Sequence, residues 1–233
     1  MGEWSAVPVN GGELQCYVAV PSSAGPWPAM AVIHGGPGFD ALTENTVNKL
    51  AAEGIAAVGP DMFRRGKPER RQGVPASASM RLADFMDDVS DALRYMASLP
   101  GIDGSRIGVM GFCMGGQVTY TAAGHLPNLT AAVAFYPGFV FERLGSGQDA
   151  APFDTTADIQ CPIMVLTGAD DVNPSPEQAS QMDAALTEAG VVHEMHLYPG
   201  AAHAFMSEGN ASYREDAATD GWVQCLKWLN AHL

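Results

Sequence analysis

Cys113 is the residue of this chain whose surroundings best suit covalent chemistry. It lies in the segment Gly-Phe-Cys-Met-Gly-Gly, residues 111–116, between an apolar stretch at 107–110 and a segment at 117–123 that suits a helix. Glycines on both sides permit a sharp strand-to-helix turn, a nucleophile elbow, whose central side chain stands exposed. The helix dipole and free amide groups at that point favour a thiolate. A cysteine that packs as a small hydrophobic residue is the alternative, but the flanking glycines favour a nucleophile.

An acid and a histidine follow Cys113 in the order that such a site requires, each after a later strand. An apolar stretch at 162–167 leads to Asp170 and Asp171, and a stretch at 191–198 leads to His203. Asp171 would hold His203 in one tautomer, and His203 would stabilise the thiolate and protonate the leaving group. We prefer Asp171 as the acid and keep Asp170 as the alternative.

A glycine-rich loop, His-Gly-Gly-Pro-Gly at residues 34–38, follows an apolar stretch at 29–33. We expect its histidine, His34, to shape the loop, and the backbone N–H groups of Gly36 and Met114 to form an oxyanion hole. Neither the G-x-G-x-x-G nor the P-loop pattern is present, which disfavours a phosphate site. The other histidines have no metal-ligand partner at useful spacing, so we expect no cofactor and no metal.

Strands and helices alternate along the chain. Residues 7–9 and 14–20 flank Asn10-Gly11-Gly12 and predict an antiparallel hairpin. Further strands are predicted at 29–33, 55–59, 107–110, 131–136, 162–167 and 191–198, and helices at 45–53, 82–99, 117–123, 178–189 and 222–229. In the second helix an apolar stripe faces the core, and acidic residues, Asp88 among them, are expected on the opposite, solvated face.

This alternation predicts a single α/β domain over residues 1–233, with a mainly parallel sheet, helices on both faces and a ligand site at the carboxyl ends of the strands. The stretch 138–158 is the one long irregular connection, and we expect it to form a short lid or a pocket wall.

Composition limits the partners and the compartment. With 26 acidic and 12 basic side chains the net charge is −14, which disfavours nucleic acid and anionic membranes. The N-terminus has no basic or apolar leader and no stretch approaches the length of a membrane span, so we expect a soluble, cytoplasmic monomer or homodimer acting on a small molecule. Four widely spaced cysteines without a C-x-x-C pair argue against disulfides and structural zinc.

Three segments resemble the dienelactone hydrolase family of α/β-hydrolases: residues 111–116, Pro-Asp-Met-Phe-Arg-Arg at 60–65, and Gly-Ala-Ala-His-Ala-Phe at 200–205. The resemblance extends over nearly the whole chain. It implies an α/β-hydrolase fold, cleavage of an ester or lactone bond, and catalytic roles for Cys113, Asp171 and His203. It also places Arg65 where the family binds a substrate carboxylate, although a solvated arginine is the alternative. We further assign Tyr136 and Phe205 to substrate binding.

Two positions depart from the family pattern. Members that act on dienelactone have a glutamate, which interacts with the resting thiol, where this chain has Gly35, and a second arginine where it has Ser207. Both departures weaken the expectation of a strongly anionic lactone.

We expect a cofactor-independent acyl hydrolase that forms a thioester on Cys113. A general carboxylesterase or small peptidase related to serine hydrolases stays open, because residues 34–38 also resemble the oxyanion loop of proline aminopeptidases. A non-catalytic scaffold that binds small molecules stays open as well.

Overall fold

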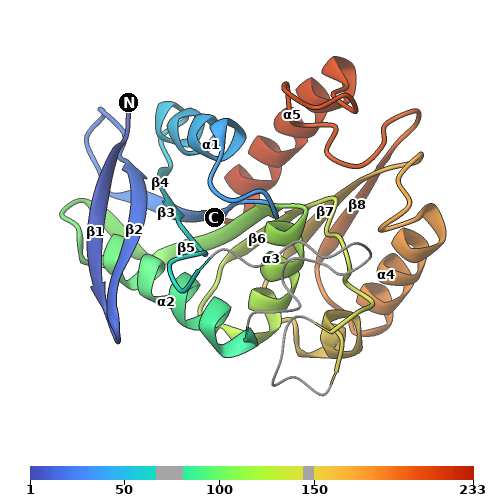
Figure 1. Ribbon diagram of the computed structural model, residues 1–233, viewed down its shortest axis with the longest axis horizontal. Helices are drawn as coiled ribbons and strands as arrows, with labels where there is room; N and C mark the ends of the chain where they lie inside the picture. The colour runs from blue at the N-terminus through green and yellow to red at the C-terminus, as the bar shows by residue number, and fades with distance from the viewer. Residues whose placement is uncertain (67–80, 144–149) are drawn as a thin grey trace.

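A single twisted sheet forms the centre of the computed structural model, which describes residues 1–66, 81–143 and 150–233 (Figure 1). Eight strands of the described chain pair in the order β1-β2-β4-β3-β5-β6-β7-β8. Their bounds are β1 Glu3–Val9, β2 Gly12–Ala19, β3 Trp27–Ile33, β4 Ala56–Pro60, β5 Ile102–Phe112, β6 Ala131–Phe135, β7 Ile163–Gly168 and β8 His193–Tyr198.

The strand directions confirm the predicted hairpin and the mainly parallel sheet. β1 pairs with β2 and β2 with β4 in antiparallel fashion, whereas every pairing from β4 through β3 to β8 is parallel. The hairpin turns at Gly11 and Gly12, which have φ values of 83° and 136°. Such values favour glycine. Because β3 to β8 run the same way, the loops that follow them gather at one edge of the sheet.

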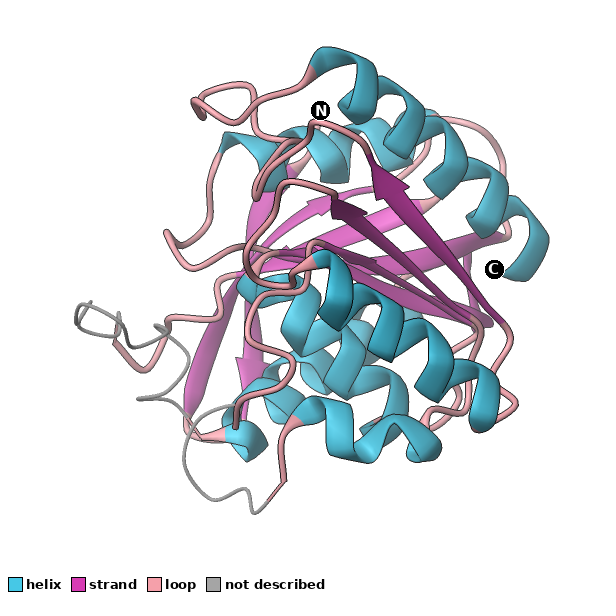
Figure 2. Cartoon of the chain, turned by 90° about the vertical axis from the view of Figure 1, so that its right-hand side faces the viewer, coloured by secondary structure: helices cyan, strands magenta, loops and turns pink. Residues whose placement is uncertain are grey.

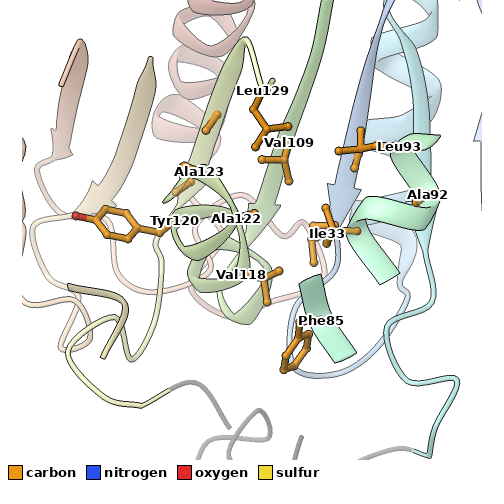
Figure 3. Close-up of a cluster of buried hydrophobic side chains, with 14 of the residues drawn as sticks. Ile33, Phe85, Ala92, Leu93, Val109, Val118, Tyr120, Ala122, Ala123 and Leu129 are labelled. Atoms are coloured by element: carbon orange, nitrogen blue, oxygen red, sulfur yellow. The ribbon is translucent and has the colours of Figure 1, made fainter. Parts of the chain in front are cut away.

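Helices cover both faces of the sheet, as predicted (Figure 2). α1 and α5 pack on one face, and α2, α3 and α4 on the other (Figure 1). Each face has its own apolar cluster, and Figure 3 shows the one between the sheet and α2 and α3, in which Ile33, Val109, Val118 and Phe85 come together. The bounds are α1 Ala41–Ala52, α2 Leu82–Ser98, α3 Met114–His125, α4 Pro176–Glu188 and α5 Glu215–His232.

Some element ends differ from the prediction for local reasons. α1 begins at Ala41, four residues early, because the Asp40 carboxylate accepts hydrogen bonds from the N–H and hydroxyl of Thr43 and caps the helix. β5 begins five residues early, at Ile102. The expected irregular connection contains the 3₁₀ helix η2, Pro152–Asp158, while residues 144–149 of the expected lid lie outside the described part of the chain.

The described helices include none with both the length and the apolar character needed to cross a membrane.

Candidate active site

Cys113 occupies a strained turn between β5 and α3. Its φ and ψ are 56° and −113°, a region that residues other than glycine seldom adopt. A side chain on Gly111 would collide with the carbonyl of Gly115, and one on Gly115 would collide with the end of β3 at Ile33. The two glycines thus permit the close packing that the turn needs, and the predicted strand-turn-helix geometry around Cys113 is present.

His203 joins the thiol to a buried carboxylate. The Nδ1 atom of His203 lies 2.8 Å from Oδ2 of Asp171, whose side chain is fully buried, and His203 also hydrogen-bonds the Cys113 sulfur. The second oxygen of Asp171 accepts the N–H of Asn173 at 2.9 Å, which fixes the carboxylate. The neighbouring residue, Asp170, is exposed. The structure therefore brings together Cys113, His203 and Asp171.

The charges of these groups support one another. Burial alone would raise the pKa of Cys113, but the hydrogen bond and charge of His203, together with the N–H groups of Met114 and Gly36, outweigh it and lower that pKa. Burial opposes the charged form of His203, yet the bonds to Asp171 and Cys113 raise the pKa of His203 well above its ordinary value. These shifts favour a thiolate beside an imidazolium.

The other three cysteines differ sharply from Cys113. Burial raises the pKa of Cys16 to about 12, that of Cys161 to about 11 and that of Cys225 to about 12. All three are buried and none forms a disulfide. Among the four cysteines, only Cys113 has a lowered pKa.

The two expected oxyanion donors converge on the Cys113 sulfur. Met114 opens α3 and Gly36 lies in the loop after β3, and the backbone N–H of each hydrogen-bonds the sulfur. The same two groups are suitably placed to receive a negative oxygen that develops on a carbon attached to that sulfur. Gly35 lies beside them, and a Cβ added there would be 3.7 Å from the Cys113 Cβ.

Arg65 is held by two carboxylates of α2. Its guanidinium lies 2.6 Å from Oδ2 of Asp88 and 3.5 Å from Oδ1 of Asp84, while Arg64 bonds the other oxygen of Asp88 at 2.8 Å. The Arg65 side chain keeps 30% of its surface exposed. Its contact with a substrate carboxylate stays a prediction.

The position of Asp88 corrects the sequence analysis, which put it on the solvated face of its helix. Asp88 is completely buried. It lies three residues after Phe85 and four before Ala92, both buried, so the helical spacing already contained the signal. Burial raises the pKa of Asp88, and the bonds to Arg64 and Arg65 oppose that shift. Sequence reasoning missed this cluster because its partners lie about 24 residues away.

The other two residues assigned to substrate binding, Tyr136 and Phe205, form an aromatic cluster with His203. Tyr136 and Phe205 are buried, and the ring of Tyr136 meets the rings of His203 and Phe205 edge-on at 5.1 and 5.2 Å. Both aromatic rings thus support the loop that carries His203, and their contact with substrate stays a prediction. Ser207 lines a cleft of about 440 Å³ between α1 and α5, to which neither Cys113 nor His203 contributes.

The described residues contain no group of three or more histidine, cysteine, aspartate or glutamate side chains arranged to hold a metal ion.

A mainly parallel sheet with a strained strand-turn-helix at Cys113, an acid after β7 and a histidine after β8 defines the α/β-hydrolase fold. The family model described as "Dienelactone hydrolase family" matches residues 14–233. The chain belongs to this family, and it is a hydrolase that acts on ester or lactone bonds.

Individual relatives agree with this assignment. The chain is 32% identical over 231 residues to a Salmonella typhimurium protein named "Putative carboxymethylenebutenolidase", with 97% of this chain and 85% of the relative covered. It is 32% identical to the protein of the same name from Escherichia coli K12, with 98% and 86% covered. The crystal structure of a "Putative Dienelactone Hydrolase" from Klebsiella pneumoniae superposes with a TM-score of 0.88 at 30% identity, covering 99% of this chain and 98% of that one.

Proposed function

We propose that this hydrolase works by covalent catalysis on Cys113, without a cofactor. The observation that carries the proposal is the position of His203 between the Asp171 carboxylate and the Cys113 sulfur, where it favours a thiolate. Strain at Cys113 adds support, because unfavourable backbone conformations concentrate at functional sites. A scaffold that only binds small molecules would need neither feature.

The reaction proceeds in two halves. The Cys113 thiolate attacks the carbonyl carbon, and the N–H groups of Gly36 and Met114 stabilise the oxyanion. When the tetrahedral intermediate collapses, the bond to the leaving oxygen breaks and His203 gives that oxygen its proton, which leaves a thioester on Cys113. His203, now neutral, then takes a proton from water as the water attacks the thioester. Collapse of this second intermediate releases the carboxylic acid and regenerates the thiolate and the imidazolium.

For substrate, we propose a small ester or lactone, with a carboxylated lactone preferred. The name carboxymethylenebutenolidase, borne by both relatives described above, denotes an enzyme that acts on a lactone carrying a carboxyl group. Arg65 supports the preference, because its side chain is partly exposed while two carboxylates of α2 hold the guanidinium in place. Such anchoring reduces the flexibility that a free arginine would lose on binding. Peptidase activity has no comparable support from the site.

Trapping the acyl-enzyme tests the covalent step. The protein is mixed with an excess of a p-nitrophenyl ester, quenched in acid within the first turnovers and digested, and we expect the acyl group on the Cys113 peptide, released by neutral hydroxylamine as a thioester. Cys113→Ala should give no adduct and almost no hydrolysis. Cys161→Ala, at a buried cysteine, is the matched control and should behave as the unchanged protein. Turnover by Cys113→Ala within a few fold of the unchanged protein would overturn the proposal.

A further inference from the structure

His34 is a fully buried histidine with both ring nitrogens engaged by the backbone. Its Nε2 accepts the N–H of Met62 at 3.1 Å, and its Nδ1 lies 2.7 Å from the carbonyl oxygen of Gly35. Because Nε2 receives a hydrogen bond from an amide, the ring proton must be on Nδ1, which therefore donates to the carbonyl. The two backbone partners thus select a single tautomer, with the proton on Nδ1.

The bond to Gly35 has a consequence for the neighbouring N–H. The carbonyl of Gly35 and the N–H of Gly36 belong to the same peptide unit, and in a trans peptide these two groups point in opposite directions. The N–H of Gly36 hydrogen-bonds the Cys113 sulfur and is one of the two oxyanion donors. A side chain that holds the carbonyl therefore also aims the donor.

The orientation of the Gly35–Gly36 peptide unit has to be fixed by hydrogen bonds, because two glycines allow more backbone rotation than other residues. The Gly35 carbonyl accepts a second hydrogen bond, from the N–H of Gly38 at 3.1 Å, within the same loop. His34 supplies the bond that comes from outside this turn. Its ring is held by Met62 and by the edge-on contact with Phe63, whose ring centre is 4.8 Å away.

We propose that His34 is a positioning residue of the oxyanion hole. Its Nδ1–H holds the Gly35–Gly36 peptide so that the N–H of Gly36 points at the reacting centre, and the bond from Met62 keeps the ring in the required tautomer. This inference rests on the proposed function, since it concerns the donor that serves acylation of Cys113. It assigns His34 no contact with substrate.

Two substitutions separate the two ends of the ring. His34→Asn retains a donor near the position of Nδ1 and loses the acceptor for Met62, whereas His34→Gln reaches toward Met62 and loses the donor to Gly35. We expect His34→Gln to lower kcat for a p-nitrophenyl ester by about 10²–10³, the effect of losing one oxyanion donor, with little change in KM. His34→Asn should stay within about tenfold of the unchanged protein, since its donor is kept.

Alkylation of Cys113 by iodoacetamide supplies a readout that a general structural defect would not produce. Substitution at the iodoacetamide carbon creates no oxyanion, so at a pH where the thiol is fully ionised His34→Gln should react as fast as the unchanged protein. The pH of half-maximal alkylation should rise, because the Gly36 N–H also stabilises the resting thiolate. Thermal unfolding of each variant shows that it is folded.

The outcomes are distinct. A larger loss of kcat in His34→Asn than in His34→Gln would show that activity depends on the bond to Met62 rather than on the bond to Gly35, and would overturn the proposal. Equal activity in both variants and the unchanged protein would overturn it as well. If His34→Gln does not fold, His34→Asn decides: retained activity supports the proposal, and a thousandfold loss in a folded protein refutes it. Activity retained in Cys113→Ala would instead refute the proposed function.

Discussion

Replacement of Asp171 by asparagine removes a charge from the buried carboxylate that bonds His203, while keeping the shape of the side chain. In the structure one oxygen of Asp171 lies 2.8 Å from Nδ1 of His203, and the other accepts the N–H of Asn173. An asparagine that keeps the bond to Asn173 through its oxygen must turn its NH₂ group toward Nδ1 of His203. Nδ1 can then only accept, which favours the neutral ring with its proton on Nε2.

The expected size of the effect follows from the lost hydrogen bond. A bond to a charged group contributes about 1.5–3 kcal/mol, and about 1.36 kcal/mol corresponds to one pKa unit, so the pKa of His203 should fall by about one to two units. The imidazolium lowers the pKa of Cys113, and that pKa should therefore rise. We expect the pH of half-maximal alkylation by iodoacetamide to move upward, and kcat/KM for an aryl ester to fall by roughly 10²–10⁴.

Asp170→Asn is the matched control, because it removes the same charge at the adjacent, exposed position. Its kcat/KM should stay within about twofold of the unchanged protein, as is usual for a surface substitution. Both variants are assayed for ester hydrolysis and alkylation between about pH 5 and pH 9, the range that brackets ordinary histidine and cysteine pKa values. A greater loss in Asp170→Asn, or an alkylation profile unchanged in Asp171→Asn, would refute the assignment of the acid.

Three further predictions concern the thiol and its surroundings. At pH 6 iodoacetamide should label Cys113 in the native protein and spare the three buried cysteines, as read by mass spectrometry of the digest; label mainly elsewhere would contradict a stabilised thiolate. Arg65→Ala should lower kcat/KM for a carboxylated lactone by roughly ten- to a hundredfold, with neutral aryl esters barely affected. An unchanged ratio of the two activities would make Arg65 a purely structural cation. Gly35→Glu should fold, because a Cβ there meets its neighbours at ordinary contact distances. The new carboxylate, placed beside the sulfur, should raise the pKa of Cys113 and slow its alkylation at pH 6. An unaltered rate would contradict the prediction that a charge at position 35 acts on the thiolate.

Much of the site was predictable because its parts are local in the chain. The elbow at Cys113 depends on glycines within three residues of it, and a backbone turn is decided by the residues that form it. His203 lies five residues after the end of β8, and parallel strands bring their carboxyl ends to one edge, so the alternation of elements was enough to place it near Cys113. The same reasoning predicted the hairpin and the two helical layers.

Other features depended on which side chains meet across the fold. Asp170 and Asp171 are adjacent and chemically identical, and only the path of the loop after β7 turns Asp171 toward His203, 32 residues away. Asp88 is buried because Arg64 and Arg65, from another element, neutralise it there.

His34 illustrates the same division within one loop. The sequence by itself determined that a histidine and two glycines follow β3, a pattern that predicts an oxyanion loop. Only the tertiary structure decided that the N–H of Met62, 28 residues away, donates to Nε2 of His34. The ring proton is therefore on Nδ1, which donates to the Gly35 carbonyl. The physical reason is that helices, strands and turns follow from short-range backbone preferences, whereas hydrogen-bond direction and charge at a site depend on groups that folding brings together from distant parts of the chain.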